Sequence, residues 1–414
     1  MSVASATPVR QRITAIISIA ALALTLFPTA LFAGQREMPL RRYVVHEGVT
    51  HGNLTIYPIT SAEQFDSRLF LTLDDGLRTG EVEVTEGAGV RPMVRQRPGD
   101  RMQMAPTNRG SGAEVNRLML LNRSNRPLVL LAGEVVTGGK QDRVVAKDMI
   151  VPSQSDPVDL NVFCVEPGRW TERAGTNSGF SGGASFHVGN SDVSVNVDRG
   201  ASNAYQVGIM VQPSVRSKAM VEKDQSQVWD QVGKANEANK QLASSAPAAV
   251  AGNATVELNG TSSYAQVQEN KAVQYGMHKR VQDIETVKTP KGDTVSLTAQ
   301  LRAMNAVGVV VAVNGQVIWA DIFADNAMLL KYWPKLELSY ASESITTRGQ
   351  KTFSYVPAAQ HFVDTLEGNH EVVDNSPGVY RHTEVSGNGY KVFALTALLP
   401  KTGYDVHISK VETR

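Results

Sequence analysis

The chain has 414 residues, of which 42% are hydrophobic and 20% charged, and this composition allows one large hydrophobic core or two smaller ones. Its formal net charge of +1 argues against a nucleic-acid-binding protein and against attachment to an anionic membrane surface. Cys164 is the only cysteine, so no intrachain disulfide can form and a zinc site would have few ligands. The histidines show no metal-ligand spacing, and we expect neither a metal site nor a cofactor.

Residues 1–33 have the pattern of an export signal. Arg10 and Arg12 precede an uncharged apolar run that contains Pro28 near its end and is followed by Ala33 and Gly34. We therefore expect a signal peptide over residues 1–33 and a periplasmic or secreted mature protein. The run is also long enough to cross a bilayer, so the alternative is an inner-membrane anchor formed by residues 13–33. The membrane would then be contacted only through this segment.

Residues 40–170 are predicted to be rich in β-strands. Short β-branched runs are separated by Gly, Pro and Asn, and several of the runs are apolar on both faces. Strands of this kind belong to the interior of a sandwich or of a barrel-like sheet, or lie under covering helices. The runs are LTIYPIT, RLFLTL, EVEVTE, LMLLNR, PLVLLAGEVV, RVVAKDMIVP and VDLNVFCVE.

The middle of the chain changes character twice. Residues 171–205 are rich in Gly, Ser and Asn and are predicted to form a flexible insertion. Residues 214–290 contain two stretches with apolar residues at helical spacing and charges between them, which predict two amphipathic surface helices.

Residues 291–414 are predicted to mix helices and strands. The dipeptide Asn314-Gly315 predicts a two-residue type I′ hairpin that sets Val310 opposite Trp319. A helix from about Asp325, disturbed at Pro334, a short helix and C-terminal antiparallel strands follow. The predicted short helix and strands lie near residues 357–366, 379–384, 389–398 and 403–412. This order of elements predicts an α+β fold, and we expect one domain over residues 34–414.

The polar stretch AGEVVTGGKQDRVVAKDMIVP, residues 132–152, stands out between apolar runs. It is not a phosphate loop, because its spacing is one residue too long and a strand follows it. If Gly138-Gly139 is a two-residue hairpin loop, Glu134 lies opposite Arg143, and the arginine compensates a partly buried carboxylate. Lys140 and Gln141 remain at the turn, where they can face a ligand.

A second polar turn, CVEPGRW, follows the next predicted strand. Cys164 alternates onto one face with apolar residues, which predicts a core thiol rather than a nucleophile. Glu166 lies just past the strand end, where it can act as a general base or pair with Arg169. Arg169 and Trp170 complete the turn and are candidate ligand-binding residues.

Two polar residues late in the chain are further catalytic candidates. Asp321 follows a strand and either caps the next helix or contributes to a site. His407 lies in the late strand YDVHISKV, where it is either hydrogen-bonded within a sheet or part of a catalytic group.

These stretches together resemble the ARG and Rhodanese-Phosphatase-superfamily-associated domain family, abbreviated ARPP. The matching segments are GEVVTGGKQDR at 133–143, CVEPGRW at 164–170, QVW at 227–229, ADIF at 320–323, WPKL at 333–336 and VHIS at 406–409. The family has no established activity, and its association with ADP-ribosylglycohydrolases and phosphatases implies a link to nucleotide or ADP-ribose chemistry. The predicted export signal weakens this link for the present chain, since NAD and ADP-ribose are scarce outside the cytoplasm. The insertion at 171–205 also extends a shorter family loop.

The sequence therefore leaves three functions open. The favoured one is an exported protein that binds a small anionic ligand or a protein partner through Lys140, Gln141, Arg143, Arg169 and Trp170. The first alternative is a hydrolase with Glu134 or Glu166 as general base, assisted by Asp321 or His407, acting on a nucleotide or ADP-ribose-like substrate. The second alternative is an envelope structural or interaction protein with an exposed apolar patch.

Overall fold

The computed structural model describes residues 43–86, 117–138, 141–168, 185–188, 191–194, 206–288, 294–347, 349, 352, 354–365 and 367–413. The predicted signal peptide and most of the predicted insertion at 171–205 lie outside these residues. Positions 41–414 group into one compact unit. Within the described ranges, every helix is too short or too polar to cross a bilayer.

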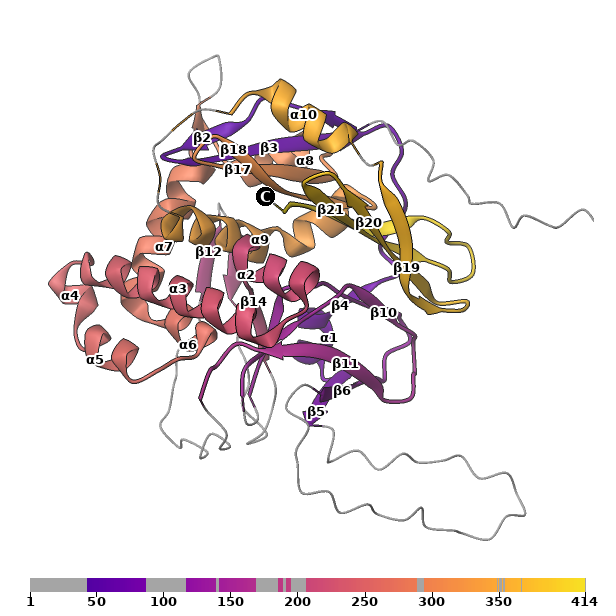
Figure 1. The fold of residues 1–414 in the computed structure, drawn as a ribbon, viewed down its shortest axis with the longest axis horizontal. Helices are drawn as coiled ribbons and strands as arrows, with labels where there is room; N and C mark the ends of the chain where they lie inside the picture. The colour runs from indigo at the N-terminus through magenta and orange to yellow at the C-terminus, as the bar shows by residue number, and fades with distance from the viewer. Residues whose placement is uncertain are drawn as a thin grey trace, which may run out of the picture. The chain divides into compact units, whose positions relative to one another are not determined.

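The largest sheet combines the beginning and the end of the chain. It has nine antiparallel strands in the order β1-β3-β17-β18-β22-β21-β20-β19, and β2 pairs with β3 beside β1 (Figure 1). These strands are β1 (Tyr43–Val45), β2 (Val49–His51), β3 (Leu54–Ser61), β17 (Gly308–Val313), β18 (Gln316–Phe323), β19 (Asn369–Ser376), β20 (Tyr380–Gly387), β21 (Tyr390–Ala397) and β22 (Asp405–Glu412). Strand β17, with the sequence GVVVAV, is buried at every position because β3 and β18 flank it and helices cover the sheet.

A second layer of strands comes from the N-terminal half. A six-stranded sheet has the order β14-β8-β9-β11-β6-β5, and a three-stranded sheet has the order β10-β7-β4. Their strands are β4 (Leu71–Thr72), β5 (Val82–Glu86), β6 (Arg117–Asn122), β7 (Leu128–Leu130), β8 (Glu134–Thr137), β9 (Arg143–Val145), β10 (Met149–Val151), β11 (Val158–Cys164) and β14 (Gln206–Met210). Two further pairs join β12 (Ser185–Val188) to β13 (Ser191–Ser194) and β15 (Val287–Lys288) to β16 (Thr294–Val295).

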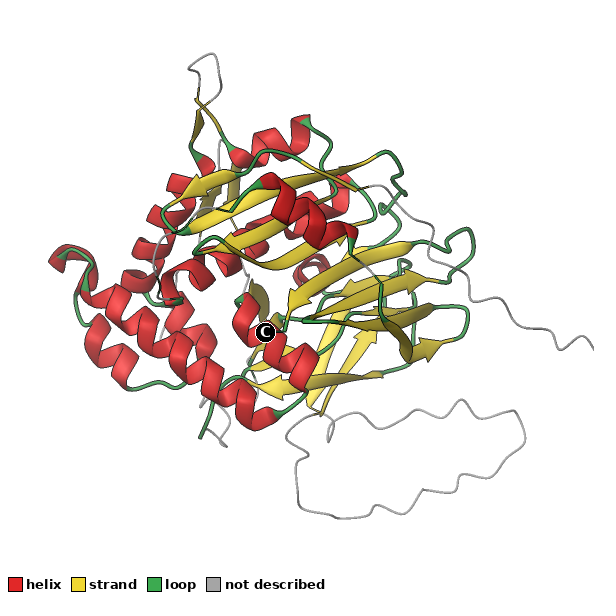
Figure 2. Ribbon diagram, turned by 45° about the horizontal axis from the view of Figure 1, so that its top comes forward, coloured by secondary structure: helices red, strands yellow, loops and turns green. Residues whose placement is uncertain are grey.

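Most of the helices lie between β14 and β17 in the chain. Figure 2 shows that the helices gather mainly on the left of the view and the strands on the right. They are α1 (Leu73–Thr79), α2 (Pro213–Ser217), the π-helix η1 (Lys218–Glu222), α3 (Gln225–Ser244), α4 (Ala248–Ala251), α5 (Ala254–Asn259), α6 (Tyr264–Glu269), α7 (Lys271–Glu285), α8 (Leu297–Ala303), α9 (Asn326–Thr346) and α10 (Val356–Asp364). The α+β class and the β-rich N-terminal half predicted from the sequence are confirmed.

Helix α9 is the centre of the core. It packs against β3, β17 and β18 on one side and against β14, α3 and α7 on others, and most of its side chains are buried. Asp325 caps its first turn and accepts a hydrogen bond from the backbone N–H of Met328, so the helix begins where the sequence predicts. Helix α10 packs against β1 and β18. Because strand residues alternate between faces, β22 can send His407 toward Asp148 in the N-terminal half and Lys410 toward α10.

The predicted hairpin at Asn314-Gly315 forms, but its register is partly wrong. Both turn residues have the positive φ that a type I′ turn needs, 52° and 78°. A β-bulge between Val311 and Ala312 then shifts the pairing, so Trp319 lies opposite Val311 and not Val310. An inserted residue of this kind leaves no clear mark in an apolar sequence.

Two other elements differ from the prediction. The run RLFLTL is a strand only at Leu71–Thr72, because the Thr72 hydroxyl accepts a hydrogen bond from Asp75 N and starts helix α1. Strand β19, with the polar sequence NHEVVDNS, was not predicted. It is an edge strand with mostly exposed side chains, so it lacks the apolar alternation by which strands are recognised.

Candidate functional site

The two polar turns singled out in the sequence lie side by side at one end of the six-stranded sheet. Strand β9 runs between β8 and β11, and Arg143 lies opposite Cys164. The backbone N–H of Asp142 donates to Glu166 Oε2 at 3.2 Å, and Val165 N–H donates to the Asp142 carbonyl at 2.9 Å. The described parts of the two motifs that are most specific for the family therefore form one edge, which we call the polar edge: residues 138, 141–143 and 164–168.

The predicted cross-strand pair of Glu134 and Arg143 is wrong. Arg143 lies opposite Val136, two positions later than a two-residue loop at Gly138-Gly139 would give. The Asp142 carboxylate accepts from Gly138 N–H at 3.3 Å and from the Ser263 hydroxyl at 2.5 Å. This side chain therefore ties the end of β8 to the start of helix α6.

The candidate binding residues have different positions. Gln141, Arg143 and Glu166 are all buried at the polar edge, with exposed fractions of 1%, 3% and 3%. Within the described part of the chain, the side-chain oxygen of Gln141 accepts no hydrogen bond. Lys140, Arg169 and Trp170 lie outside the described residues, although Lys140 directly precedes Gln141 and Arg169 directly follows Gly168 in the sequence.

The polar edge is fastened to helix α3. Gln225, at the start of this helix, accepts from Cys164 N–H at 2.9 Å and donates to the Cys164 carbonyl at 2.8 Å. Cys164 is fully buried, and burial raises the pKa of its thiol, so the prediction of a core thiol is confirmed. One turn further along, Trp229 begins an open groove of about 590 Å³, which is also lined by Asp230, Gly233, Lys234, Glu237, Ala238, Gln241 and Thr346.

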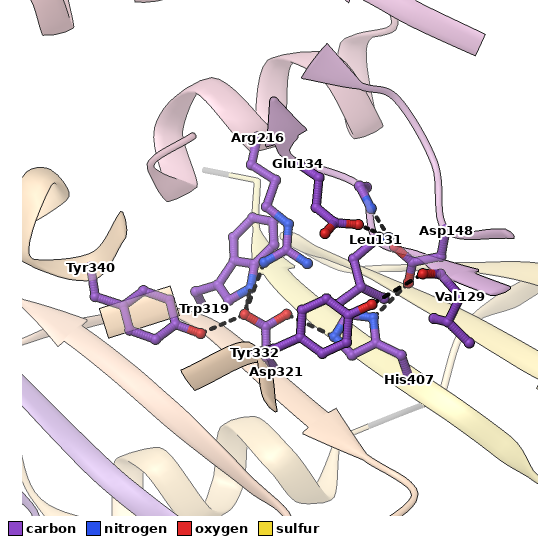
Figure 3. A network of polar contacts seen from close by, with 11 residues as sticks. Val129, Leu131, Glu134, Asp148, Arg216, Trp319, Asp321, Tyr332, Tyr340 and His407 are labelled. Atoms are coloured by element: carbon purple, nitrogen blue, oxygen red, sulfur yellow. Dashed lines mark hydrogen bonds and ion pairs between the residues drawn. The ribbon is translucent and has the colours of Figure 1, made fainter. Parts of the chain in front are cut away.

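Asp321 and His407 meet in a different place, inside the core between the two strand layers (Figure 3). His407 Nδ1 lies 2.6 Å from Asp148 Oδ2, and His407 Nε2 lies 3.0 Å from Asp321 Oδ1. The Asp148 Oδ1 atom accepts from Ala132 N–H at 2.7 Å. All three side chains have an exposed fraction of 0%. We call Asp148, His407, Asp321 and Arg216 the buried ionic network.

Three donors converge on the other oxygen of Asp321. Arg216 Nη1 and Trp319 Nε1 each donate to Asp321 Oδ2 at 2.9 Å, and the Tyr340 hydroxyl donates to it at 2.5 Å. The Arg216 guanidinium also lies over the Trp319 ring, 4.7 Å from its centroid. Asp321 is thus part of strand β18, and the alternative of a helix cap is wrong, because Asp325 caps α9.

The charges of the buried ionic network balance. Burial alone would lower the pKa of His407, but Asp148 and Asp321 on either side raise it to about 8. Burial likewise opposes ionisation of both carboxyls, yet the neighbouring cations hold the pKa values of Asp148 and Asp321 below their usual range. At neutral pH the network therefore contains two carboxylates and two cations.

Glu134 belongs to a neighbouring buried cluster. It is 0% exposed, and its Oε1 accepts from Lys335 Nζ at 2.6 Å while its Oε2 accepts from Leu131 N–H at 2.7 Å. Lys335 also pairs with Asp74. Burial raises the pKa of Glu134, Lys335 lowers it, and the nearby Asp74 carboxylate raises it again, so the net shift is upward. The lysine of the WPKL motif, and not Arg143, is therefore the partner of this glutamate.

Asp148, Arg216, Lys335 and Tyr340 were missed by sequence reasoning, although one local signal for Arg216 existed. Gly133, the first residue of the GEVV motif, has φ of +95°, and a Cβ atom there would lie 2.8 Å from Arg216 Cδ. A glycine at this point of an apolar stretch indicates the close approach of another group, but not which one.

The geometry therefore defines an α+β domain that has two paired polar turns at one edge of a sheet and an ionic network sealed in its core. The sequence model described as ARG and Rhodanese-Phosphatase-superfamily-associated Protein domain, ARPP-1, matches residues 42–411. The chain belongs to this family, as its motifs predict. Neither a curated protein nor a solved structure matches the chain.

Proposed function

We propose that the protein binds a small anionic ligand at the polar edge. The observation that carries the proposal is the pairing of the two family motifs, GEVVTGGKQDR and CVEPGRW, through β9 and β11. The carboxylate of Asp142 is occupied by Ser263 and Gly138 N–H, and that of Glu166 accepts from Asp142 N–H. The same motifs also carry the basic residues Lys140, Arg143 and Arg169. This combination supports an anion as ligand.

The side-chain oxygen of Gln141, which accepts no hydrogen bond within the described residues, restricts the class of ligand further. A buried amide oxygen without a hydrogen-bond partner costs free energy that a donor on the ligand would recover. An anion that also carries hydroxyl or amine donors, such as a sugar phosphate or a nucleotide, satisfies both requirements. This chemistry includes ADP-ribose-like compounds but does not require them.

The geometry gives less support to a hydrolase. Both ring nitrogens of His407 are hydrogen-bonded to carboxylates, so neither can take a proton from a substrate. Asp321, His407 and Glu134 are sealed from solvent, and Glu134 is paired with Lys335. Glu166 is the remaining candidate base, and its carboxylate already accepts from a backbone N–H. We therefore interpret the buried ionic network as scaffold that ties the two strand layers together.

A protein partner receives support from one feature only. The groove along α3 starts beside the polar edge and is open, but its described lining is mostly charged and polar. The exposed large apolar side chains in the described part of the chain are Val44, Leu69, Val256, Tyr275, Val295, Tyr355 and Val372, and they come from separate elements. We also retain the proposal that the protein is exported to the periplasm or secreted, on the basis of residues 1–33.

A thermal-shift screen tests the proposal. The purified chain is heated with inorganic phosphate, sugar phosphates, nucleotides and ADP-ribose, and the screen is repeated on Lys140→Ala and Arg169→Ala. Arg123→Ala is the matched control, because Arg123 is an exposed arginine just past β6 of the same sheet, paired with Glu83. We expect a phosphate-bearing compound to raise the melting temperature of the parent and the control but of neither variant. Equal shifts in all four proteins would refute the site.

A further inference from the structure

A small pocket lies between the β2–β3 hairpin and the start of helix α10, and it shares no lining residue with the polar edge. Its volume is about 230 Å³. Thr50 and Thr55 lie opposite each other on β2 and β3, and Tyr57 follows on the same strand. Ser354 and Tyr355 come from the segment that leads into α10. Residues separated by about 300 positions thus build one pocket.

Two buried hydroxyl groups of the pocket lie close to each other. Tyr57 is only 2% exposed, and within the described residues neither its hydroxyl nor the buried Ser354 hydroxyl makes a hydrogen bond of good geometry. Burial raises the pKa of the Tyr57 phenol, a weak hydrogen bond with the Ser354 side chain lowers it, and Glu47 raises it. Each hydroxyl thus has one weak partner and keeps donor and acceptor capacity that a hydrogen-bonding ligand would fill.

The backbone around the pocket is adapted to this arrangement. Gly48 lies against the Tyr57 ring, and a Cβ atom there would approach the ring to 2.7 Å. Helix α10 begins after Tyr355 with no side-chain hydrogen bond to cap its first turn. Pro357 has no N–H and the Ala358 N–H donates to the Tyr355 carbonyl at 2.9 Å, so Val356 carries the first backbone N–H that can face a ligand oxygen. The Tyr355 side chain is 70% exposed at the rim and offers an aromatic face.

The lining determines the class of ligand. Hydroxyls both donate and accept, the Glu47 carboxylate accepts, and the described lining has no Lys or Arg that would favour an anion. An aromatic ring beside paired hydroxyls suits a ligand with one apolar face and several hydroxyl groups. The volume is below the range of roughly 300–1,000 Å³ that holds drug-sized ligands, so a single ring fits best. We propose that this pocket binds a neutral polyhydroxylated ligand of monosaccharide size.

The experiment uses the whole purified chain with D-glucose, D-galactose, N-acetylglucosamine and myo-inositol as probes, followed by saturation-transfer NMR and calorimetry. Tetramethylammonium and inorganic phosphate are included as probes for a cation site and an anion site, so that these can be distinguished from a site for neutral polyols. Tyr57→Phe removes the buried hydroxyl and keeps the ring, so the fold is retained. Tyr43→Phe is the matched control, since Tyr43 is a buried tyrosine of the adjacent strand β1 that is not among the described residues of the pocket lining.

We expect at least one polyol to bind the parent and Tyr43→Phe with the same Kd, and Tyr57→Phe to bind it about tenfold more weakly. Ser354→Ala should weaken the same ligand. The proposal is overturned if no polyol binds at concentrations of about 10 mM, or if Tyr57→Phe binds as well as the parent. Binding of tetramethylammonium instead would also overturn it, because Glu47 and the two tyrosine rings would then form a cation site.

Discussion

His407 Nδ1 lies 2.6 Å from Asp148 Oδ2, and this contact joins two residues that are 259 positions apart in the chain. It connects the last strand of the nine-stranded sheet to the segment between β9 and β10 in the N-terminal layer. With Asp321 on the other ring nitrogen, His407 has carboxylates on both sides and no exposed surface. The contact therefore stabilises the association of the two layers and does not face a substrate.

The pH dependence of stability follows from this contact. The pKa of His407 is about 8 in the folded protein and 6.5 in the unfolded chain, so its contribution is fully present below pH 6.5 and is lost as the pH rises through 8. The shift corresponds to about 2 kcal/mol of the free energy of unfolding. Urea unfolding at intervals between pH 6.5 and 8.5 measures it. A free energy that rises over this range would contradict the ionic assignment.

The buried lysine of the WPKL motif gives a second prediction. Lys335→Met leaves Glu134 without its cation in the core, and we expect the free energy of unfolding to fall by about 3 kcal/mol or more. Adding Glu134→Gln, which keeps an acceptor for Leu131 N–H, should recover more than half of the loss. Lys147→Met is the control. Its partner Asp374 is about a quarter exposed, so its effect should stay below about 1 kcal/mol.

Substitution of two glycines with similar backbone angles can distinguish the destabilising effect of close packing from that of backbone strain. Gly133 and Gly168 have φ of +95° and +88°, but only at Gly133 would a Cβ atom meet another group, the side chain of Arg216. Gly168→Ala should cost about 1–2 kcal/mol from the left-handed backbone alone. Gly133→Ala should cost at least about 2 kcal/mol more, since it displaces Arg216 from Asp321. Equal melting temperatures for the two variants would show that Arg216 is not held at this position.

The turn of the polar edge can be loosened without removing a charge. Ser263→Ala deletes the hydroxyl that donates to Asp142 at 2.5 Å and that also caps helix α6. We expect a loss of about 1–2 kcal/mol in stability and a weaker response to any anionic ligand. Ser296→Ala removes the equivalent cap of α8 and is the control for the helix effect. If both variants responded to the ligand identically, the Asp142 turn would not be part of the ligand-binding site.

The sequence predicts local features better than it predicts partners. The α+β order, the type I′ turn at Asn314-Gly315 and the helix start near Asp325 depend on nearby residues and are present in the structure. The partner of Glu134 could not be predicted, because Lys335 is 201 positions away and no local pattern links the two. The same reason applies to Asp148 and His407. Long-range ion pairs inside a core depend on how whole layers stack, and a single sequence does not contain that information in readable form.

We assign ligand binding to the polar edge and stability to the buried ionic network. This division can be tested directly. It is tested by measuring, for one anionic hit, both the Kd and the melting temperature of Arg169→Ala and His407→Asn. We predict that Arg169→Ala loses at least about tenfold in affinity with an unchanged melting temperature. His407→Asn should melt at a lower temperature, yet bind with the parent Kd where it is folded. The reverse pattern, with affinity lost in His407→Asn and retained in Arg169→Ala, would contradict the account.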